Sequence, residues 1–461
     1  MAIAEKPLYY LSIHEAQQLI QKRQLSPVEL TKAVLERIQA IDERLHAYIN
    51  LMADSAMQEA RAAEGEIARG NWRGPMHGIP IAVKDQLDVE GAQARIRQHT
   101  KGVGDATAVR KLREAGAIMM GKLHMSSLPD AELPLPRNPW NTEHITGGSS
   151  TGSGAAVAGG LCLGSLGEDT AGSIRNPSAF CGIAGLKATY GRVSRYGLAP
   201  LSWSLDHCGP MARVVEDTAL MLKAIAGHDP KDPTSSTAPV SDYASALREE
   251  VKGMVIGVPR DYINECAPRT ESTVLGLVDN AIEELKSLGA RIEEVKVPTL
   301  NLATIANAVI YYNEFWAAHK SDAAAVLKTG APQRRARIYL GLLTGSADYI
   351  QAQRVRSRVR AEFAEVFKKV DCLALPCQTG PAPLVKDVGP IDTLFKHVVP
   401  EYNGPFNLAG LPTLVVPCGF SESKLPIALQ LVGKPFDEMT ILRAGYTYQQ
   451  HMKWYERRPA V

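Results

Sequence analysis

The chain has little net charge, no long apolar run and no closely paired cysteines, and each absence excludes a class of protein. Basic residues exceed acidic ones by only two over 461 residues, so charge gives no reason to expect nucleic acid or an anionic membrane as a partner. The seven cysteines are an odd number and include no C-x-x-C pair, which argues against a disulfide framework or a zinc ribbon. We expect them to be small buried hydrophobes in a reducing compartment.

Segments that would direct the chain to a membrane are also missing. The first ten residues lack the apolar core of a signal peptide. The most apolar glycine-rich run, residues 155–166, is too short and too rich in small residues to span a bilayer. We therefore expect a cytoplasmic protein with no membrane partner.

The order of apolar patterns predicts an α/β fold. The first 70 residues indicate helices, with a cap at Ser12 and a capping box over residues 26–29. Farther along, strand-like and helical runs alternate, which favours a mixed, mostly parallel twisted sheet covered by helices on both faces. The strand-like runs are residues 79–83, 117–120, 254–258, 291–295, 372–375, 413–417 and 427–432. The helical runs are residues 106–115, 214–225, 273–288, 348–370 and 439–451.

We expect a single large domain over residues 1–461. Its parts would be N-terminal helices over 1–70, a catalytic core over 71–230 and a mainly helical region over 300–345. That last region either borders the substrate site or consists of outer helices, and we place the second interpretation slightly ahead of the first. No internal repeat or low-complexity linker divides the chain.

Two turns rich in glycine and hydroxyl groups carry the strongest chemical signal. They are residues 147–154 (GGSSTGSG) and residues 168–175 (EDTAGSIR). An apolar run that ends at Leu166 places Ser173 just beyond a strand end, where open α/β sheets build their sites. Successive backbone N–H groups of the second turn can point at one oxyanion. Glycines also serve tight turns and close packing alone, which is the simpler structural interpretation.

A lysine lies upstream in the apolar segment 79–85 (IPIAVKD). Serine needs a base to act as a nucleophile, and a partly buried lysine can be that base because desolvation disfavours its charged form. Asp85 is a poor partner for Lys84, since successive strand residues point to opposite faces. We therefore expect Lys84 to lack a carboxylate partner, and these residue types indicate hydrolysis through a Ser–Ser–Lys relay. A surface lysine with a buried stem is the simpler alternative.

Other motifs explain less of the chain. Neither G-x-x-x-x-G-K-[ST] nor G-x-G-x-x-G after a strand occurs, so no phosphate-binding fingerprint is present. Residues 148–152 match G-x-S-x-G, the nucleophile elbow of α/β-hydrolases, and Asp371 and His397 follow in the required order. That hypothesis leaves Lys84 and the turn around Ser173 without a role.

Taken together, the lysine strand and the two turns resemble the amidase signature family. The family places its bridging serine at the first serine of Gly-Gly-Ser-Ser and its nucleophile 24 residues later, as at Ser149 and Ser173. The resemblance extends over most of the chain, through residues 177–182, 185–187, 190–194, 209–213 and 407–412.

This resemblance implies a role for each matching residue. Ser173 would be the nucleophile and Lys84 would be the base. Ser149, which the family holds through a cis peptide bond, would shuttle the proton between them. The oxyanion hole would be formed by the backbone N–H groups of Thr170, Ala171, Gly172 and Ser173. Asp169 and Arg175 would hold the turn rather than touch substrate.

The chain departs from the family's usual pattern at three places. Ala171 and Thr151 stand where the family usually has glycine, and the turn must avoid positive φ at Ala171 because alanine resists it. Residues 91–104 lack the Thr-Thr and Gly-Ser pattern common after the lysine strand, and they are basic. In the family this region borders the substrate entrance, so the change suggests a more open mouth.

The resemblance implies an amidase that cleaves a small or aryl amide through an acyl-enzyme and requires no metal or organic cofactor. It also implies carbamate (urethane) or ester cleavage, because the acyl-enzyme chemistry is shared. We expect a small-molecule amide, carbamate or ester as the partner, without nucleic acid, and we allow for a homodimer.

Two further hypotheses belong to other classes. One is the glutaminase subunit of a tRNA-dependent amidotransferase, against which we weigh the neutral charge and the unfamiliar residues 398–404. The other is a non-catalytic binding protein on the same fold, against which the intact set of Lys84, Ser149 and Ser173 argues.

Overall fold

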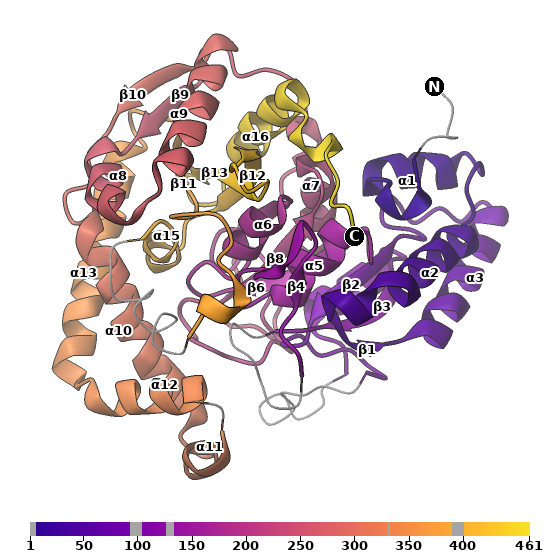
Figure 1. Cartoon of the computed structure of the whole chain (residues 1–461), viewed down its shortest axis with the longest axis horizontal. Helices are drawn as coiled ribbons and strands as arrows, with labels where there is room; N and C mark the ends of the chain where they lie inside the picture. Colours follow the sequence, from indigo (N-terminus) through magenta and orange to yellow (C-terminus); the bar gives the residue numbers. More distant parts are fainter. Residues whose placement is uncertain (1–5, 93–103, 126–132, 331, 390–400) are drawn as a thin grey trace.

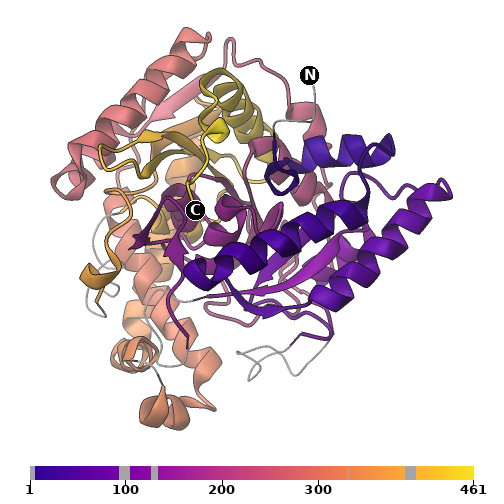
Figure 2. The ribbon, with the colours of Figure 1, turned by 45° about the vertical axis from the view of Figure 1, so that its right-hand side comes forward.

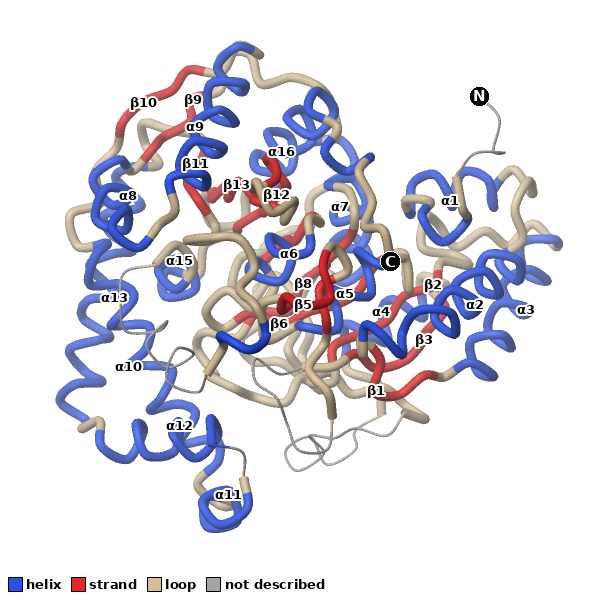
Figure 3. Tube along the Cα trace, viewed as in Figure 1, coloured by secondary structure: helices blue, strands red, loops and turns tan. Residues whose placement is uncertain are grey.

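One mixed sheet runs through the molecule, as the computed structural model of residues 6–92, 104–125, 133–330, 332–389 and 401–461 shows (Figure 1, Figure 3). The predicted α/β fold is thereby confirmed. Eleven strands form the sheet in the order β1-β3-β2-β6-β8-β7-β12-β13-β11-β9-β10. Their bounds are β1 (Tyr48–Leu51), β2 (Pro80–Lys84), β3 (Ile118–Leu123), β6 (Gly164–Asp169), β7 (Ala184–Lys187), β8 (His207–Ala212), β9 (Val255–Val258), β10 (Arg291–Glu294), β11 (Cys372–Pro376), β12 (Thr413–Phe420) and β13 (Pro426–Gly433).

Parallel and antiparallel pairs occupy different parts of this sheet. β2 pairs parallel with β3 and β6, and β9 pairs parallel with β10 and β11. The strands between these two groups, from β6 through β8, β7, β12 and β13 to β11, pair antiparallel, as β1 does with β3. The sheet is therefore mixed, as predicted, with two parallel groups that flank an antiparallel centre. Among its described strands, four parallel pairs are outnumbered by six antiparallel ones, so the expectation that parallel pairing dominates is corrected.

Helices cover the sheet and carry its connections. Their bounds are α1 (Ile13–Gln21), α2 (Pro27–Leu45), α3 (Ala53–Ala68), α4 (Thr107–Glu114), α5 (Thr151–Gly159), α6 (Arg175–Cys181), α7 (Val215–Ile225), α8 (Arg260–Cys266), α9 (Ser272–Ser287), α10 (Leu300–His319), α11 (Ala323–Thr329), α12 (Pro332–Leu343), α13 (Ser346–Val366), α15 (Gly404–Ala409) and α16 (Glu438–Met452). A separate ribbon joins β4 (Arg137–Asn138) to β5 (Asn141–Ile145). None of the described helices is both long and apolar enough for a bilayer span.

The N-terminal segment begins as its sequence predicts and then differs. The capping boxes at Ser12 and Ser26 are both formed, and they start α1 and α2. α2 ends at Leu45, His46 after it is left-handed, and the chain then forms β1 instead of continuing as helices. Because β1 has only four residues and gains its partner from β3, local patterns within residues 1–70 did not indicate it.

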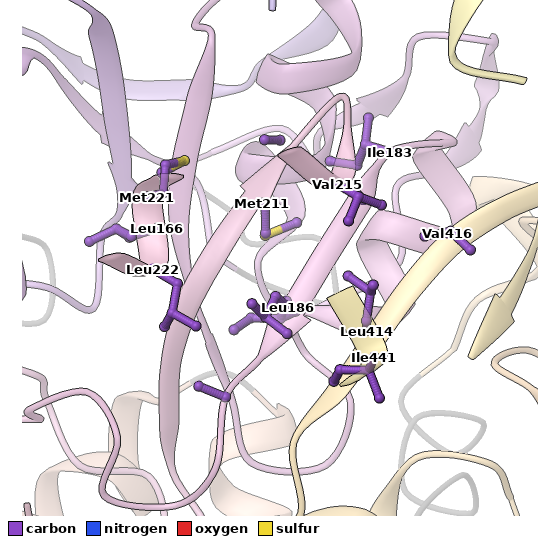
Figure 4. Close-up of a cluster of buried hydrophobic side chains, with 14 of the residues drawn as sticks. Leu166, Ile183, Leu186, Met211, Val215, Met221, Leu222, Leu414, Val416 and Ile441 are labelled. Atoms are coloured by element: carbon purple, nitrogen blue, oxygen red, sulfur yellow. The ribbon is translucent and has the colours of Figure 1, made fainter. Parts of the chain in front are cut away.

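Alternate residues of the central strands build cores on the two faces of the sheet. Leu414 and Val416 of β12 belong to a cluster with residues of α7 and α16 (Figure 4). Between them, Val415 packs with Ala179 of α6 in a separate cluster. Since successive strand residues point to opposite faces, α7 and α16 cover one face and α6 covers the other. The seven cysteines are all buried free thiols, as expected.

A helical region extends from the sheet on the far side from the N-terminal helices (Figure 1, Figure 2). In it, α10 packs against α12 and α13 and also against α15. Because α15 directly precedes β12, these helices are tied to the centre of the sheet. The region expected to be helical over residues 300–345 lies here.

Candidate active site

The ends of two neighbouring strands bring the candidate catalytic residues together. β2 and β6 are parallel, with Val83 opposite Leu166, so their carboxyl ends lie at the same edge of the sheet. Lys84 is the last residue of β2, and the turn that carries Ser173 follows β6 directly. The strand pairing therefore places the lysine next to the second hydroxyl-rich turn.

Lys84 is fully buried and its ammonium group has three acceptors. Nζ donates to Ser149 Oγ at 2.9 Å, to Glu168 Oε2 at 2.8 Å and to the Glu168 carbonyl oxygen at 3.2 Å. The expectation that Lys84 lacks a carboxylate partner is therefore wrong. The partner comes from β6, and the sequence does not show which strands are neighbours. Asp85 does face away, and it pairs with Lys122 at 3.0 Å.

The two hydroxyl-rich turns are held side by side. The peptide bond between Gly148 and Ser149 is cis. The Ser150 N–H donates to the Ser173 carbonyl oxygen at 3.3 Å, and the Gly148 N–H donates to Asn176 Oδ1 at 3.2 Å. Ser149 and Ser173 are both half-buried and line the same cavity. The structure thus brings Lys84, Ser149 and Ser173 to one place.

Asp169 organises the backbone of the second turn. Its Oδ1 accepts from the Gly172 N–H at 2.7 Å, and its Oδ2 accepts from the Ile174 N–H at 3.1 Å. Arg175 donates to the same carboxylate from Nε and Nη2 at 3.0 and 3.1 Å, and both side chains are fully buried. Burial opposes ionisation of Asp169, but the charge and hydrogen bonds of Arg175 hold its pKa far below the usual range. Asp169 and Arg175 therefore hold the turn together.

Gly172 has a conformational role instead of the oxyanion role assigned to it. Its N–H is committed to Asp169, and it does not line the cavity, whereas Thr170, Ala171 and Ser173 do. Its φ is +112°, and a Cβ there would lie 2.8 Å from the Asn403 side chain. Ala171 is not among the residues with positive φ, as its side chain requires. The candidate oxyanion donors are therefore Thr170, Ala171 and Ser173.

A second carboxylate lies behind the lysine. Thr170 Oγ1 hydrogen-bonds to Glu168 Oε1 and lies 2.8 Å from Asp206 Oδ1. Asp206 also accepts from the backbone N–H groups of Leu201 and Ser202. Burial, and then the negative charge of Glu168, raise the pKa of Asp206 to about 8. Sequence reasoning missed both carboxylates, although Glu168 follows the apolar run of β6 at the spacing that puts it on the same face as Leu166.

The cavity at this edge has a volume of about 490 Å³ and a mixed lining. Apolar side chains include Phe180 and Leu201, and charged ones include Arg269, Glu271, Arg337 and Glu401. Tyr311 of α10 and Gln333 and Arg337 of α12 contribute to the wall, so the helical region borders the site. The expectation that this region forms outer helices away from the site is therefore not what the structure shows. The Arg337 guanidinium lies over the Tyr311 ring, 5.6 Å from its centroid.

The nucleophile-elbow hypothesis finds no geometric support among the described residues. Ser150 is fully buried and its Oγ donates to the Glu168 carbonyl oxygen. Asp371 accepts from the Val255 N–H of β9. His397 and most of residues 91–104, for which an open mouth was expected, lie outside the described residues. Within the described ranges, no cluster of three or more His, Cys, Asp or Glu residues is arranged to hold a metal ion.

Comparisons with known proteins point to one family. The family model described as Amidase matches residues 29–442. A glutamyl-tRNA(Gln) amidotransferase subunit from Moorella thermoacetica is 42% identical and is matched over 98% of this chain and 99% of its own. Native peptide amidase from Stenotrophomonas maltophilia has a TM-score of 0.80 at 30% identity, over 99% of each chain. A vestigial protein complex described as revealing the evolutionary origins of an s-triazine catabolic enzyme contains a chain with a TM-score of 0.88 at 30% identity, over 96% of this chain and 99% of that one.

The chain therefore belongs to the amidase signature family. One expectation is corrected by these relatives. Proteins that match almost the whole chain are named for a glutamyl-tRNA substrate and as one subunit of a larger enzyme, which contradicts the expectation of a small-molecule partner without nucleic acid. A near-zero net charge averages the whole surface, so it did not exclude such partners. The amidotransferase hypothesis is accordingly favoured over the one placed first from the sequence.

Proposed function

We propose that this chain is the amide-hydrolysing subunit of an amidotransferase and that it releases ammonia from glutamine. The observation that carries the proposal is the contact of 2.9 Å between the buried Lys84 Nζ and Ser149 Oγ, in a cavity that Ser173 also lines. Support comes from relatives named as one subunit of a glutamyl-tRNA(Gln) amidotransferase, which match the chain over nearly its full length.

In this proposal Ser173 is the nucleophile and a proton passes from it to Ser149 and on to Lys84. Ser173 Oγ forms a bond to the amide carbon, and the backbone N–H groups of the turn stabilise the oxyanion that develops. The relay returns the proton to the leaving nitrogen as the carbon–nitrogen bond breaks. Water then attacks the acyl carbon and gives a proton to the relay. The relay returns that proton to Ser173 Oγ as the acid leaves.

The charged groups of the cavity suit an amino-acid amide. Arg269 and Arg337 are the cationic groups of the lining, and guanidinium groups bind carboxylates well. Glu271 and Glu401 are anionic groups of the same lining and complement an ammonium group. Glutamine carries both charges as well as a side-chain amide, so this combination favours it over a neutral amide.

A second candidate function is an amidase that acts on a small or aryl amide, carbamate or ester without transfer of the ammonia. The apolar part of the wall, formed by Phe180 and Leu201 among others, favours an apolar acyl or aryl group. Structural similarity to a peptide amidase at 30% identity is compatible with it. Two results separate the candidates. A preference for glutamine as substrate and the recovery of partner chains with the purified protein both support the amidotransferase hypothesis.

The test is ammonia release from glutamine, compared with release of nitroaniline from an anilide, by purified wild-type protein and two variants. Ser173→Ala removes the nucleophile and is expected to abolish turnover of whichever substrate wild type accepts, while the protein stays folded. The exposed Ser245→Ala change is the matched control and is expected to keep wild-type turnover. Wild-type rates in Ser173→Ala would overturn the proposal.

A further inference from the structure

Lys84 cannot take a proton from Ser149 while it carries its own three. An ammonium group has three protons and no lone pair. Its three acceptors are Ser149 Oγ and the Oε2 and carbonyl oxygens of Glu168, so a charged Lys84 donates one proton to each. To act as a base, Lys84 must first release the proton that it shares with Glu168 Oε2.

The Glu168 carboxylate is placed to receive that proton. It is fully buried, and its Oε2 lies 2.8 Å from Lys84 Nζ. Its other oxygen, Oε1, is held by the hydroxyl of Thr170. A buried ion pair with one oxygen fixed and the other facing the ammonium can move a proton along a single hydrogen bond without rearranging its surroundings.

The groups around the Lys84–Glu168 pair favour an arrangement in which Asp206 is protonated. Thr170 Oγ1 lies between two carboxylates but has a single proton, so its contact with Asp206 is a hydrogen bond when Asp206 is protonated and donates. The raised pKa of Asp206 agrees with that arrangement. The other titratable or charged groups whose electrostatic interactions reach Lys84, Glu168 or Asp206 are Cys208, Arg195, Tyr190 and Tyr311.

We propose that the base of this enzyme is the Lys84–Glu168 pair and that Glu168 is a positioning residue which stores the lysine proton during acylation. The proposal rests on the proposed role of Ser173. In acylation the Nζ–H bond of Lys84 breaks and an O–H bond forms on Glu168 Oε2. Lys84 then accepts the Ser149 proton, Ser149 accepts the Ser173 proton, and Ser173 Oγ bonds to the carbonyl carbon. The charge lost by Lys84 is regained when Ser149 protonates it, so the net transfer is one proton from Ser173 to Glu168.

This pair predicts an unusual response to loss of its carboxylate. In wild type Glu168 takes the lysine proton within the pair, so Lys84 becomes a base without releasing a proton to solvent. In Glu168→Gln Lys84 must release that proton to solvent before it can act, so the acid limb of the labelling rate moves to higher pH than in wild type. If Glu168 were only a nearby charge, its removal would make protonated Lys84 less stable and the limb would move to lower pH.

The experiment measures the rate of Ser173 labelling by a fluorophosphonate as a function of pH, which requires no knowledge of the substrate. Glu168→Gln is compared with wild type and with Asp85→Asn, a matched control that breaks the neighbouring buried pair with Lys122. An acid limb displaced upward in Glu168→Gln alone supports the proposal. A downward shift overturns it, and so does a slower rate with an unmoved limb, which is the signature of a purely structural role.

Two safeguards keep the result interpretable. If Glu168→Gln does not fold, the wild-type profile still decides, because the pair predicts labelling that persists below neutral pH. A lone lysine predicts labelling that rises steadily toward alkaline pH, and that result overturns the proposal. Failure to label Ser173 at any pH in folded wild type would instead refute the nucleophile assignment in the proposed function.

Discussion

The buried pair of Asp169 and Arg175 offers a quantitative test of how the catalytic turn is held. In Asp169→Asn the shape of the side chain is kept, but the Arg175 charge loses its only carboxylate contact within the described residues. Arg175 would keep its hydrogen bonds to the Asn403 carbonyl oxygen and to Gln430 Oε1, which do not neutralise it. Breaking one side of a fully buried ion pair typically costs about 3–5 kcal/mol, and we expect a loss of that size in the free energy of unfolding.

The matched control is an exposed pair with the same two-point geometry. Glu66 accepts from Arg73 Nε at 2.7 Å and from Nη2 at 2.6 Å, but the Arg73 side chain is 42% exposed. Because solvent screens that pair, Glu66→Gln is expected to cost about 0–1 kcal/mol. The assay is urea unfolding followed by tryptophan fluorescence, with the ammonia assay alongside.

The sign of the pH dependence is fixed by the same pair. The folded state lowers the pKa of Asp169, so its contribution to stability is present above the ordinary carboxyl range and is lost only as pH falls through the folded value. The full difference between Asp169→Asn and wild type should therefore be seen at neutral pH. If Asp169→Asn costs no more than Glu66→Gln there, our explanation of the turn is wrong.

Two other substitutions test separate parts of the structure. Gly172→Ala places a side chain at positive φ against Asn403, and we expect a loss of about 1–3 kcal/mol and a large fall in turnover as the turn shifts; unchanged melting and activity would contradict this. Asp217 accepts from the Ile13 and His14 N–H groups at the start of α1, and burial raises its pKa to about 7. The pKa of Asp217 is higher in the folded state than in the unfolded state. The contribution of Asp217 to the free energy of unfolding of wild type therefore falls by roughly 4 kcal/mol as pH rises from about 4 to about 7. Urea midpoints across that range should fall less steeply in Asp217→Asn, and equal slopes would refute the assignment.

Local signals carried most of what the sequence predicted correctly. The cap at Ser12 and the capping box at Ser26 involve residues at most three positions apart, so they can be found without tertiary information. Lys84, Ser149 and Ser173 could be selected because the family motif fixes their types and spacing, and their catalytic roles stay a prediction. The strands β7 and β8 were missed because glycines, prolines and polar residues interrupt their apolar patterns.

What could not be predicted depended on which segments are neighbours in space. Glu168 reaches Lys84 only because β2 and β6 pair, and these residues are 84 positions apart. Asp206 reaches Thr170 from a loop, and Arg337 reaches the cavity from α12, and no local pattern marks either residue. Long-range contacts therefore decided the charge environment of the lysine. The oxyanion donors were decided by a local contact instead, because the Asp169 side chain turns back onto the Gly172 N–H three residues later.

The most direct test of the catalytic assignment locates the covalent adduct. Wild-type protein is treated with a fluorophosphonate, digested, and the labelled peptide is sequenced by mass spectrometry. Three serines lie at or beside the relay: Ser149, Ser150 and Ser173. We predict a single adduct on Ser173 that is absent from Ser173→Ala. An adduct on Ser150 or Ser149, or a fully labelled Ser173→Ala protein, would contradict the central claim that Ser173 is the nucleophile served by Lys84 through Ser149.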